Sequence, residues 1–502
     1  MLHIVMWVAF SIFLIYAYSK FVIFTHWKRM KVPHESPNLI FGNLNLDFLL
    51  NKITVGGLVK QLYGTFKNEK LFGMYIFHNP ILVINDPDLI KEVLVKDFQY
   101  FKDKGVYYNH EIDPISSNLF RLPGRKWKVL RTRMTPLFTS GKLKQMYPLV
   151  LKNSKELVAV CNEALEQHGP LDMKDLIERF MTDSTSNIAF GINCNSLRNP
   201  DDEFRSYAKI GTNVGKYTSL LGIFGSNILD FFKLPAHSDV LVKASLRIFE
   251  TVVDYRLKQN IVRDDLMNTL MDLIGHKNKT STDSPDSSDC NSLDKLEAAA
   301  QVFLFFMAGA ETTSATITNC IYELARNPEI QKKLYKEIKD VTNFSEDLNY
   351  DILMNLSYLD MVFNETLRKH SSLPFINRIC NEDYKIPETD IQVPKGMRLV
   401  VSISGLHSNP DVYPHPDTFD PERFTKENRS KRHPYFFLPF GEGPRVCIAK
   451  RIVVLQVKIV VAQLVSNFEF SLSDKTPESL HYSKQTFLQV ANEKLYLNLR
   501  RR

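Results

Sequence analysis

Residues 440–449 read Phe-Gly-Glu-Gly-Pro-Arg-Val-Cys-Ile-Ala and decide the fold. The two glycines and the proline predict a tight turn, and the apolar run at 452–464 predicts a helix. Cys447 therefore lies at a helix N-terminus, where free backbone N–H groups and the helix dipole favour a thiolate. We interpret Cys447 as a metal ligand; a buried structural cysteine in an ordinary turn is the alternative.

A second motif, at 365–368, reads Glu-Thr-Leu-Arg and places a carboxylate and a guanidinium on one face of a helix. Apolar residues at 359–363 indicate that this pair is buried, and Arg423 offers a second guanidinium for the same carboxylate. Removing one member of such a network leaves an unpaired buried charge, at a cost of about 3–5 kcal/mol. A solvated surface ion pair is the alternative.

An apolar helix is predicted over 296–326, and its middle reads Ala-Gly-Ala-Glu-Thr-Thr at 308–313. Small side chains in mid-helix permit close approach of a flat ligand, and a threonine hydroxyl can hydrogen-bond the carbonyl one turn back. Close helix packing around Gly309 is the alternative.

Earlier in the chain, Trp127 and Arg131 lie about one helical turn apart. This spacing suits the binding of a carboxylate, and a surface stack of the two side chains is the alternative.

These four motifs, in this order, resemble the cytochrome P-450 family over essentially the whole chain after its N-terminal segment. Residues 101–142, with Asp113-Pro114 and the sequence Phe-Thr-Ser-Gly-Lys at 138–142, resemble the insect microsomal detoxification members most. The resemblance implies a mainly α fold with a small β portion. It also implies a haem b cofactor with Cys447 as axial ligand to the iron, since a thiolate ligand favours O–O cleavage.

The resemblance assigns further site residues. The haem-binding residues are Cys447, Trp127, Arg131, Arg378, Phe440, Gly441, Gly443 and Arg445. The pair for oxygen activation and proton delivery is Thr312 and Glu311, and the structural network is Glu365, Arg368 and Arg423. The substrate pocket is lined by Phe120, Leu304, Phe305, Ala308, Leu373, Ile376 and Phe487. Ala449 departs from the family pattern, which has glycine at this position.

The implied reaction is insertion of one oxygen atom of O2 into a lipophilic small molecule. Foreign plant compounds or insecticides are the expected substrates, and an endogenous lipid or hormone is the alternative. Two other classes also bind haem in this way: a haem-thiolate isomerase or peroxygenase, and a non-catalytic membrane haem-binding protein. The intact pair of Glu311 and Thr312 argues against the isomerase or peroxygenase.

No glycine-rich dinucleotide fingerprint follows a strand in the sequence, so NADPH and flavins are expected only in a partner. The resemblance implies an NADPH-dependent flavoprotein reductase, with a small haem electron carrier as a second donor. Candidate docking residues, unless they are solvated helix faces, are Lys126, Lys128, Arg133, Lys450 and Arg451. The 63 basic and 56 acidic residues give a net charge of +7, which does not indicate nucleic-acid binding.

Residues 1–27 are mainly apolar and precede Lys28, Arg29 and Lys31, which predicts a transmembrane anchor with a positive cytoplasmic flank. A cleaved signal peptide is the alternative. Prolines predict a hinge over 28–45, before a catalytic domain over 46–502. We expect the protein to reside in the endoplasmic reticulum membrane, with its catalytic domain on the cytosolic face. Six scattered cysteines, which suggest neither a disulfide framework nor a zinc site, agree with that reducing compartment.

Extended runs at 74–77 and 81–84 predict a β-hairpin, and residues 398–403 and 495–499 predict further strands. The polar, low-complexity stretch at 276–292 predicts a flexible surface loop.

Overall fold

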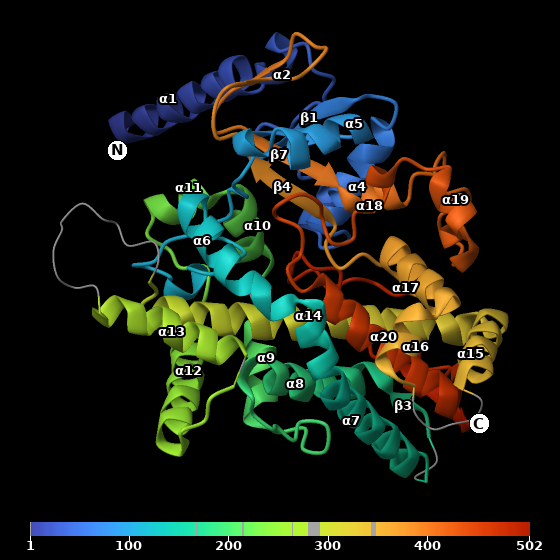
Figure 1. Cartoon of the computed structure of the whole chain (residues 1–502). Helices are drawn as coiled ribbons and strands as arrows, with labels where there is room; N and C mark the ends of the chain where they lie inside the picture. The colour runs from blue at the N-terminus through green and yellow to red at the C-terminus, as the bar shows by residue number, and fades with distance from the viewer. Residues whose placement is uncertain (1, 167–168, 213–214, 264, 280–291, 343–347) are drawn as a thin grey trace.

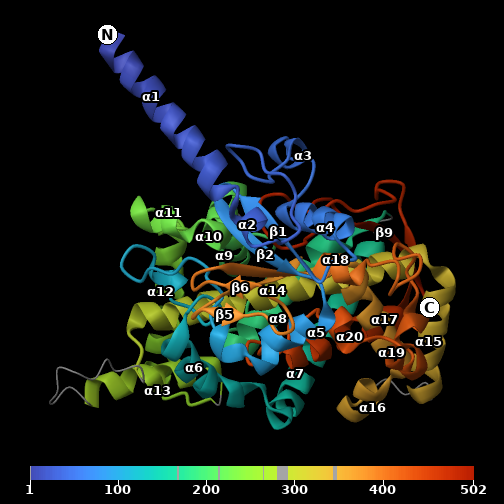
Figure 2. The same cartoon turned by 90° about the horizontal axis from the view of Figure 1, so that it is seen from above.

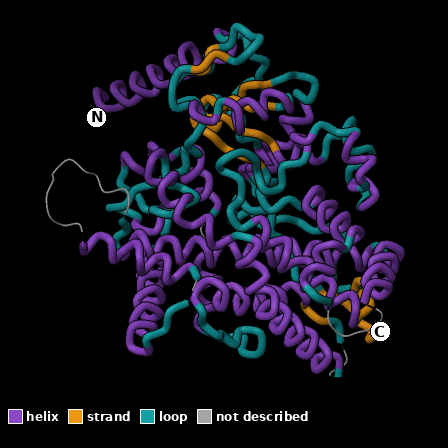
Figure 3. Tube along the Cα trace, in the orientation of Figure 1, coloured by secondary structure: helices purple, strands orange, loops and turns teal. Residues whose placement is uncertain are grey.

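A computed structural model describes residues 2–166, 169–212, 215–263, 265–279, 292–342 and 348–502 (Figure 1). Helices dominate, and strands gather in two places, near the N-terminal helices and near the C-terminus (Figure 3). The predicted class, mainly α with a small β portion, is confirmed.

The described α-helices fall in chain order as follows: α1 Leu2–Tyr18, α2 His26–Arg29, α3 Leu46–Leu49, α4 Val55–Thr65, α5 Pro87–Lys91, α6 Gly124–Met134, α7 Ser140–Leu165, α8 Met173–Phe190, α9 Glu203–Thr212, α10 Lys216–Phe224, α11 Ser226–Phe231, α12 Asp239–Gln259, α13 Leu266–Lys279, α14 Lys295–Arg326, α15 Pro328–Thr342, α16 Tyr350–Asn355, α17 Ser357–Lys369, α18 Ile403–His407, α19 Lys426–Ser430 and α20 Lys450–Asn467. Two π-helical turns are Ser19–Ile23 and Glu92–Lys96. Short 3-10 turns are Phe98–Tyr100, Pro114–Ser116, Thr135–Phe138, Pro421–Phe424 and Pro434–Phe436.

The main sheet has the strand order β1-β2-β7-β4, with β1 Leu71–Ile76, β2 Asn79–Ile84, β7 Arg398–Ser402 and β4 Phe375–Ile379. Strand β2 pairs antiparallel with β1 and parallel with β7, and β7 pairs antiparallel with β4. The predicted hairpin is therefore confirmed. A second sheet has the order β3-β9-β8, with β3 Leu171–Asp172, β9 Tyr496–Arg501 and β8 Phe468–Leu472, and a two-stranded sheet joins β5 Tyr384–Lys385 to β6 Gln392–Val393.

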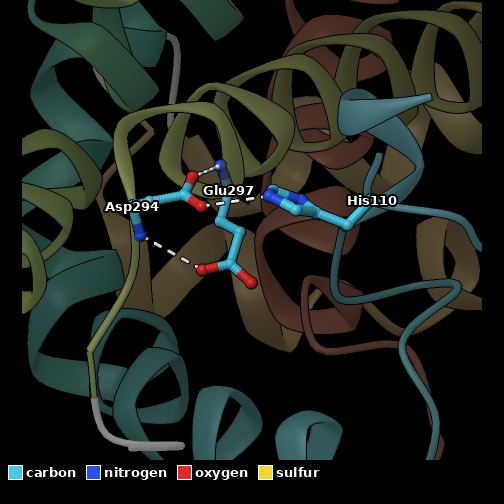
Figure 4. Close-up of side chains that lie close together, drawn as sticks. All are labelled: His110, Asp294 and Glu297. Carbon is cyan, nitrogen blue, oxygen red and sulfur yellow. Dashed lines mark hydrogen bonds and ion pairs between the residues drawn. The ribbon is translucent and has the colours of Figure 1, made fainter. Parts of the chain in front are cut away.

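Helix α14 crosses the centre of the molecule and packs on α8, α12 and α20 (Figure 1). It begins with a capping box, because the Glu297 backbone N–H donates to the Asp294 carboxylate at 2.7 Å and the Asp294 N–H donates to the Glu297 carboxylate at 3.1 Å (Figure 4). His110 Nε2 lies 3.1 Å from the Asp294 carboxylate. These three side chains offer clustered metal-ligand atoms, but helix capping and this contact account for their arrangement.

Trp27, the last residue of the predicted anchor, lies in the body of the molecule against β1. Trp27 is fully buried, and its indole N–H donates to the Met74 carbonyl of β1 at 3.1 Å. Gly73 makes room for it, since a Cβ there would overlap the indole ring. Within the predicted hinge at 28–45, β-bridges join His34 and Gly42 to β1. The exposed apolar helix is α1, which points away from the body (Figure 2).

Among the described residues, no helix combines the length and the apolar character needed to cross a membrane.

The predicted surface loop at 276–292 needs correction at both ends. Helix α13 continues to Lys279. The buried side chains of Leu266, Leu270 and Leu273 pack its earlier turns into the core. Ser292, at the far end, is buried. Residues 280–291 of the predicted loop lie outside the described residues.

The structure brings Glu365, Arg368 and Arg423 together. Arg368 makes a bidentate ion pair with the fully buried Glu365, through Nε at 2.7 Å and Nη2 at 2.8 Å. Arg423 Nε lies 3.5 Å from the same carboxylate. Burial raises the pKa of Glu365, and Arg368 opposes that shift. The two guanidinium groups therefore offset part of the effect of burial on this carboxylate.

This network also holds the segment that leads to residues 440–449, which we call the cysteine loop. Arg368 donates to the His407 carbonyl at 2.8 Å, and His407 Nε2 accepts the backbone N–H of Leu438 at 3.0 Å. Burial, with the charge of Arg368 adding to it, lowers the pKa of His407 to about 3. Because the ring stays neutral, its Nε2 can accept. Glu365 is thus linked through Arg368 and His407 to the segment that leads to Cys447.

Glu365→Ala should destabilise the protein strongly, because it leaves Arg368 and Arg423 buried without their carboxylate, at a cost of about 3–5 kcal/mol. The measurement is the free energy of unfolding in urea, together with the yield of folded protein. Glu422→Ala is the matched control, since it removes an exposed ion pair with Lys333 at 2.6 Å and should change little. Equal stability of the two variants would contradict a structural role for Glu365.

Candidate functional site

The loop at 440–449 is shaped by two glycines in the left-handed region. Gly441 has φ +69° and Gly443 has φ +75°, and a Cβ at Gly443 would overlap the Leu94 carbonyl oxygen. The Cys447 backbone N–H donates to the Phe440 carbonyl at 3.0 Å and closes the turn. Cys447 is partly exposed, and α20 begins three residues later at Lys450.

The electrostatics at Cys447 differ from the sequence expectation. Burial raises the pKa of its thiol, while a hydrogen bond from the Ala449 backbone and the charges of Arg131, Lys104 and Lys450 lower it. On balance the pKa of the thiol lies above its ordinary value. The surrounding cations favour the charged form only in part.

The charges of Lys104 and Arg131 act on Cys447, and those of Arg378 and Arg445 act on Lys104, so we call these four residues the cation cluster. The Arg445 guanidinium stacks 3.9 Å over the ring of the buried Trp127, and it lies 3.4 Å from the Asp103 carboxylate. Burial, followed by the charge of Arg378, lowers the pKa of Arg445 to about 9. Burial also lowers the pKa of Arg378 to about 10 and that of Lys104 well below its usual range.

Two donors of the cation cluster are unsatisfied. Among the described residues nothing accepts a hydrogen bond from Arg378 Nε or Arg445 Nη1, and both atoms are buried. Buried donors of this kind cost free energy unless an acceptor reaches them. The cluster therefore fits a group with carboxylates, and the two propionates of haem b have that charge. The residues present fit the cofactor.

The sequence interpretation missed Lys104 and Asp103. Lys104 Nζ lies 3.4 Å from the centre of the Phe120 ring and its charge acts on Cys447. Asp103 accepts from Arg445 and from the Gly124 backbone N–H at 2.7 Å, and so fixes the start of α6. No local pattern marks either residue, because their neighbours come from far along the chain.

Helix α14 presents two different faces at 308–312. Ala308 is exposed although most of the helix is buried, and the Thr312 hydroxyl donates to its carbonyl at 2.7 Å. Gly309 faces the other way, because a Cβ there would lie 3.2 Å from the Thr185 side chain of α8. Close packing thus explains Gly309, and the open position is Ala308.

Glu311 lines a cavity of about 290 Å³ between α8, α9, α14 and the C-terminal loop. Glu178, Lys174 and Arg205 line the same cavity. Burial raises the pKa of Glu311 to about 8, and the charge of Glu178 adds to the shift while Lys174 opposes it. Glu311 is therefore mostly protonated at neutral pH and lies beside a space that suits water.

The predicted pocket residues share partial exposure. Ala308 is exposed, and intermediate exposure is found for Phe120, Leu304, Phe305, Leu373, Ile376 and Phe487. Leu304, Phe305 and Ile448 pack against one core cluster, and Ile376 lies next to Gly441. Phe487 instead packs against the core beside β1, β2 and β4. Leu304 and Phe305 thus share a core cluster with Ile448 of the 440–449 loop, while Phe487 packs against a different cluster.

The predicted docking residues are exposed, namely Lys126, Lys128, Arg133, Lys450 and Arg451. Lys126 lies 3.4 Å from the Glu297 carboxylate, and Arg451 donates to the Ser140 hydroxyl at 3.2 Å.

Phe440 packs against the main core, stacked on Phe363 with ring centres 6.5 Å apart.

Comparison with known proteins identifies the architecture. The family model for cytochrome P450 matches residues 33–498. Probable cytochrome P450 6a14 of Drosophila melanogaster is 37% identical, with 97% of each chain covered. Cytochrome P450 6A1 of Musca domestica is 38% identical over 95% of this chain and 94% of its own length, and cytochrome P450 6a2 of Drosophila melanogaster is 36% identical over 98% of each. The chain therefore belongs to the cytochrome P450 family and is a monooxygenase that uses haem b.

Proposed function

We propose that this monooxygenase inserts one atom of O2 into lipophilic foreign compounds, such as plant toxins or insecticides, with electrons from NADPH delivered by a partner flavoprotein reductase. The observation that carries the haem chemistry is the partly exposed Cys447 beside a cation cluster with unsatisfied donors. The substrate class is supported by similarity to insect relatives and by apolar side chains such as Leu304 and Phe305. An endogenous lipid or hormone is the alternative substrate.

The residues of the site would hold haem b as follows. The Cys447 sulfur would bind the iron, and Trp127, Arg131, Arg378 and Arg445 would bind the propionates. Lys104 would be a fifth polar side chain in this group. Gly441 and Gly443 allow the turn that leads to Cys447. When bound, the haem supplies the reductive activation of O2.

Protons must reach a largely apolar site, and we assign their delivery to Glu311 and Thr312. Glu311 holds a proton near neutral pH, and it can regain that proton from water in the adjoining cavity. The Thr312 hydroxyl lies on the open stretch of α14 and already donates to the Ala308 carbonyl. It can turn to donate into the site and then regain its proton along the same path.

We further propose that α1 anchors the chain in the endoplasmic reticulum membrane, with the catalytic domain on the cytosolic face. Its support is a set of large apolar side chains on α1 that are between 52% and 69% exposed: Met6, Trp7, Phe10 and Phe13. Exposed apolar surface of this size favours burial in lipid. Extraction of microsomes with alkaline carbonate tests this, since release of the full chain would refute the anchor.

Reconstitution with an NADPH-dependent flavoprotein reductase tests the reaction. Turnover of a lipophilic test compound should require the reductase, NADPH and O2 together, because the sequence has no dinucleotide fingerprint of its own. Charge-reversal of Lys128 and Arg133, both exposed on α6, should raise the concentration of reductase needed for half-maximal rate. Turnover with peroxide but not with reductase would establish a peroxygenase instead, and absence of both would leave a haem-binding protein.

Thr312→Ala should uncouple the enzyme. The variant keeps a small, helix-compatible side chain, so folding and haem content should survive, but the hydroxyl that passes protons is lost. We expect NADPH consumption to continue while product per NADPH falls and hydrogen peroxide rises. Thr312→Ser is the matched control, since it keeps the hydroxyl and should lie near the parent. Unchanged coupling in Thr312→Ala would mean that protons arrive by another route.

A further inference from the structure

A buried hydrogen-bonded pair joins two segments that are far apart in the sequence. Asp113, just before the 3-10 turn Pro114–Ser116, is completely buried, and His237, just before α12, has a side chain that is 2% exposed. His237 Nδ1 lies 2.8 Å from the Asp113 carboxylate, and the Ala236 backbone N–H donates to the same oxygen at 3.0 Å. The short stretch at 236–237 is thus held by one carboxylate.

Arg121 completes the arrangement and fixes the state of the ring. Its Nη2 lies 3.3 Å from His237 Nε2, and its Nη1 donates to the Tyr107 carbonyl at 3.3 Å. A guanidinium can only donate, so Nε2 is the acceptor and His237 carries its proton on Nδ1. Burial and the charge of Arg121 lower the pKa of His237, which agrees with a neutral ring. The cluster therefore holds one carboxylate, one neutral imidazole and one guanidinium.

The cluster lies next to the proposed substrate pocket. Arg121 directly follows Phe120, and the His237 ring meets the Phe303 ring of α14 edge-on with centres 5.3 Å apart. Gln301 of α14 holds the same segment from the other side, since it accepts the Leu119 backbone N–H at 2.9 Å and donates to the Ser117 carbonyl at 2.8 Å. The segment that bears Phe120 is therefore fastened at two points, to α14 by Gln301 and to residues 236–237 by Asp113.

We propose that Asp113, His237 and Arg121 form a clasp that positions Phe120 in the pocket wall and must open for substrates to pass between residues 105–122 and 232–238. The pocket assignment within this proposal rests on the proposed function, whereas the clasp itself does not. Separating the segments breaks the His237–Asp113 bond and leaves Asp113 and Arg121 without their shared partner. Because Asp113 is completely buried and Arg121 is partly buried, the clasp opposes that separation more strongly than an exposed contact would. These three are thus positioning residues that select which substrates are admitted.

The test compares four variants of the full chain. His237→Leu removes both hydrogen bonds, whereas His237→Gln keeps an N–H donor for Asp113 and an oxygen acceptor for Arg121. His481→Leu is the control, because His481 makes a bond of the same length, 2.8 Å, to Glu493 at the exposed surface. Asp113→Asn, which keeps the volume but removes the negative charge that strengthens the bonds to His237 and Ala236, replaces His237→Leu if that variant folds poorly.

Two readouts are measured on the purified, haem-loaded proteins. The first is amide hydrogen exchange over 105–122 and 232–238, which needs neither substrate nor reductase. The second is the stopped-flow rate of the haem spectral shift caused by a bulky lipophilic compound. In His237→Leu we expect exchange to accelerate by about tenfold to a hundredfold, the factor that a hydrogen bond to a charged group commonly contributes. Binding should accelerate as well, and His237→Gln and His481→Leu should resemble the parent.

Unchanged exchange in both His237→Leu and Asp113→Asn would overturn the clasp. Faster exchange with an unchanged binding rate would overturn its role in substrate access while leaving the structural contact intact. If the proposed function is wrong, the parent protein will not turn over a substrate with the reductase. The hydrogen-exchange result does not depend on that outcome.

Discussion

The ion pair between Glu365 and Arg368 is the interaction on which the rest of the site depends. A carboxylate with no exposed surface requires compensation, and Arg368 and Arg423 provide it. Arg368 then uses its remaining donors on the carbonyls of His407 and Pro416. The neutral ring of His407 in turn accepts the backbone N–H of Leu438, just before the cysteine loop. The path of the chain before Cys447 is therefore determined by a charge buried in α17.

Electrostatics also links the fold to the cofactor. Lys104, Arg131, Arg378 and Arg445 come from four separate parts of the chain, and their burial lowers each pKa. Such a concentration of positive charge is unfavourable by itself, which explains why Asp103 lies against Arg445 and why an anionic ligand would stabilise the folded state. Across α14, Glu311 meets a different environment, where burial and Glu178 keep it protonated. Glu311 thus holds a proton beside a cavity that both acidic and basic side chains line.

Periodicity and turn chemistry predicted the parts of the fold that depend on local sequence. The long central helix, the β1–β2 hairpin and the helix after the cysteine loop follow from apolar spacing and from glycine and proline positions. Boundaries that depend on tertiary packing could not be predicted. Trp27 reads as part of an apolar segment, but it is buried because Gly73 leaves space for its ring. The contacts of Lys104 with Phe120 and of His237 with Asp113 join separate segments, and no local sequence pattern predicts them.

The central claim is that Cys447 supplies the thiolate ligand to haem iron, and the carbon monoxide difference spectrum of the reduced protein tests it most directly. Cys161 and Cys320 are buried cysteines elsewhere in the core and provide matched serine controls. The account predicts that Cys447→Ser loses the thiolate-type spectrum while Cys161→Ser and Cys320→Ser retain it. A thiolate-type spectrum that persists in Cys447→Ser would contradict the assignment.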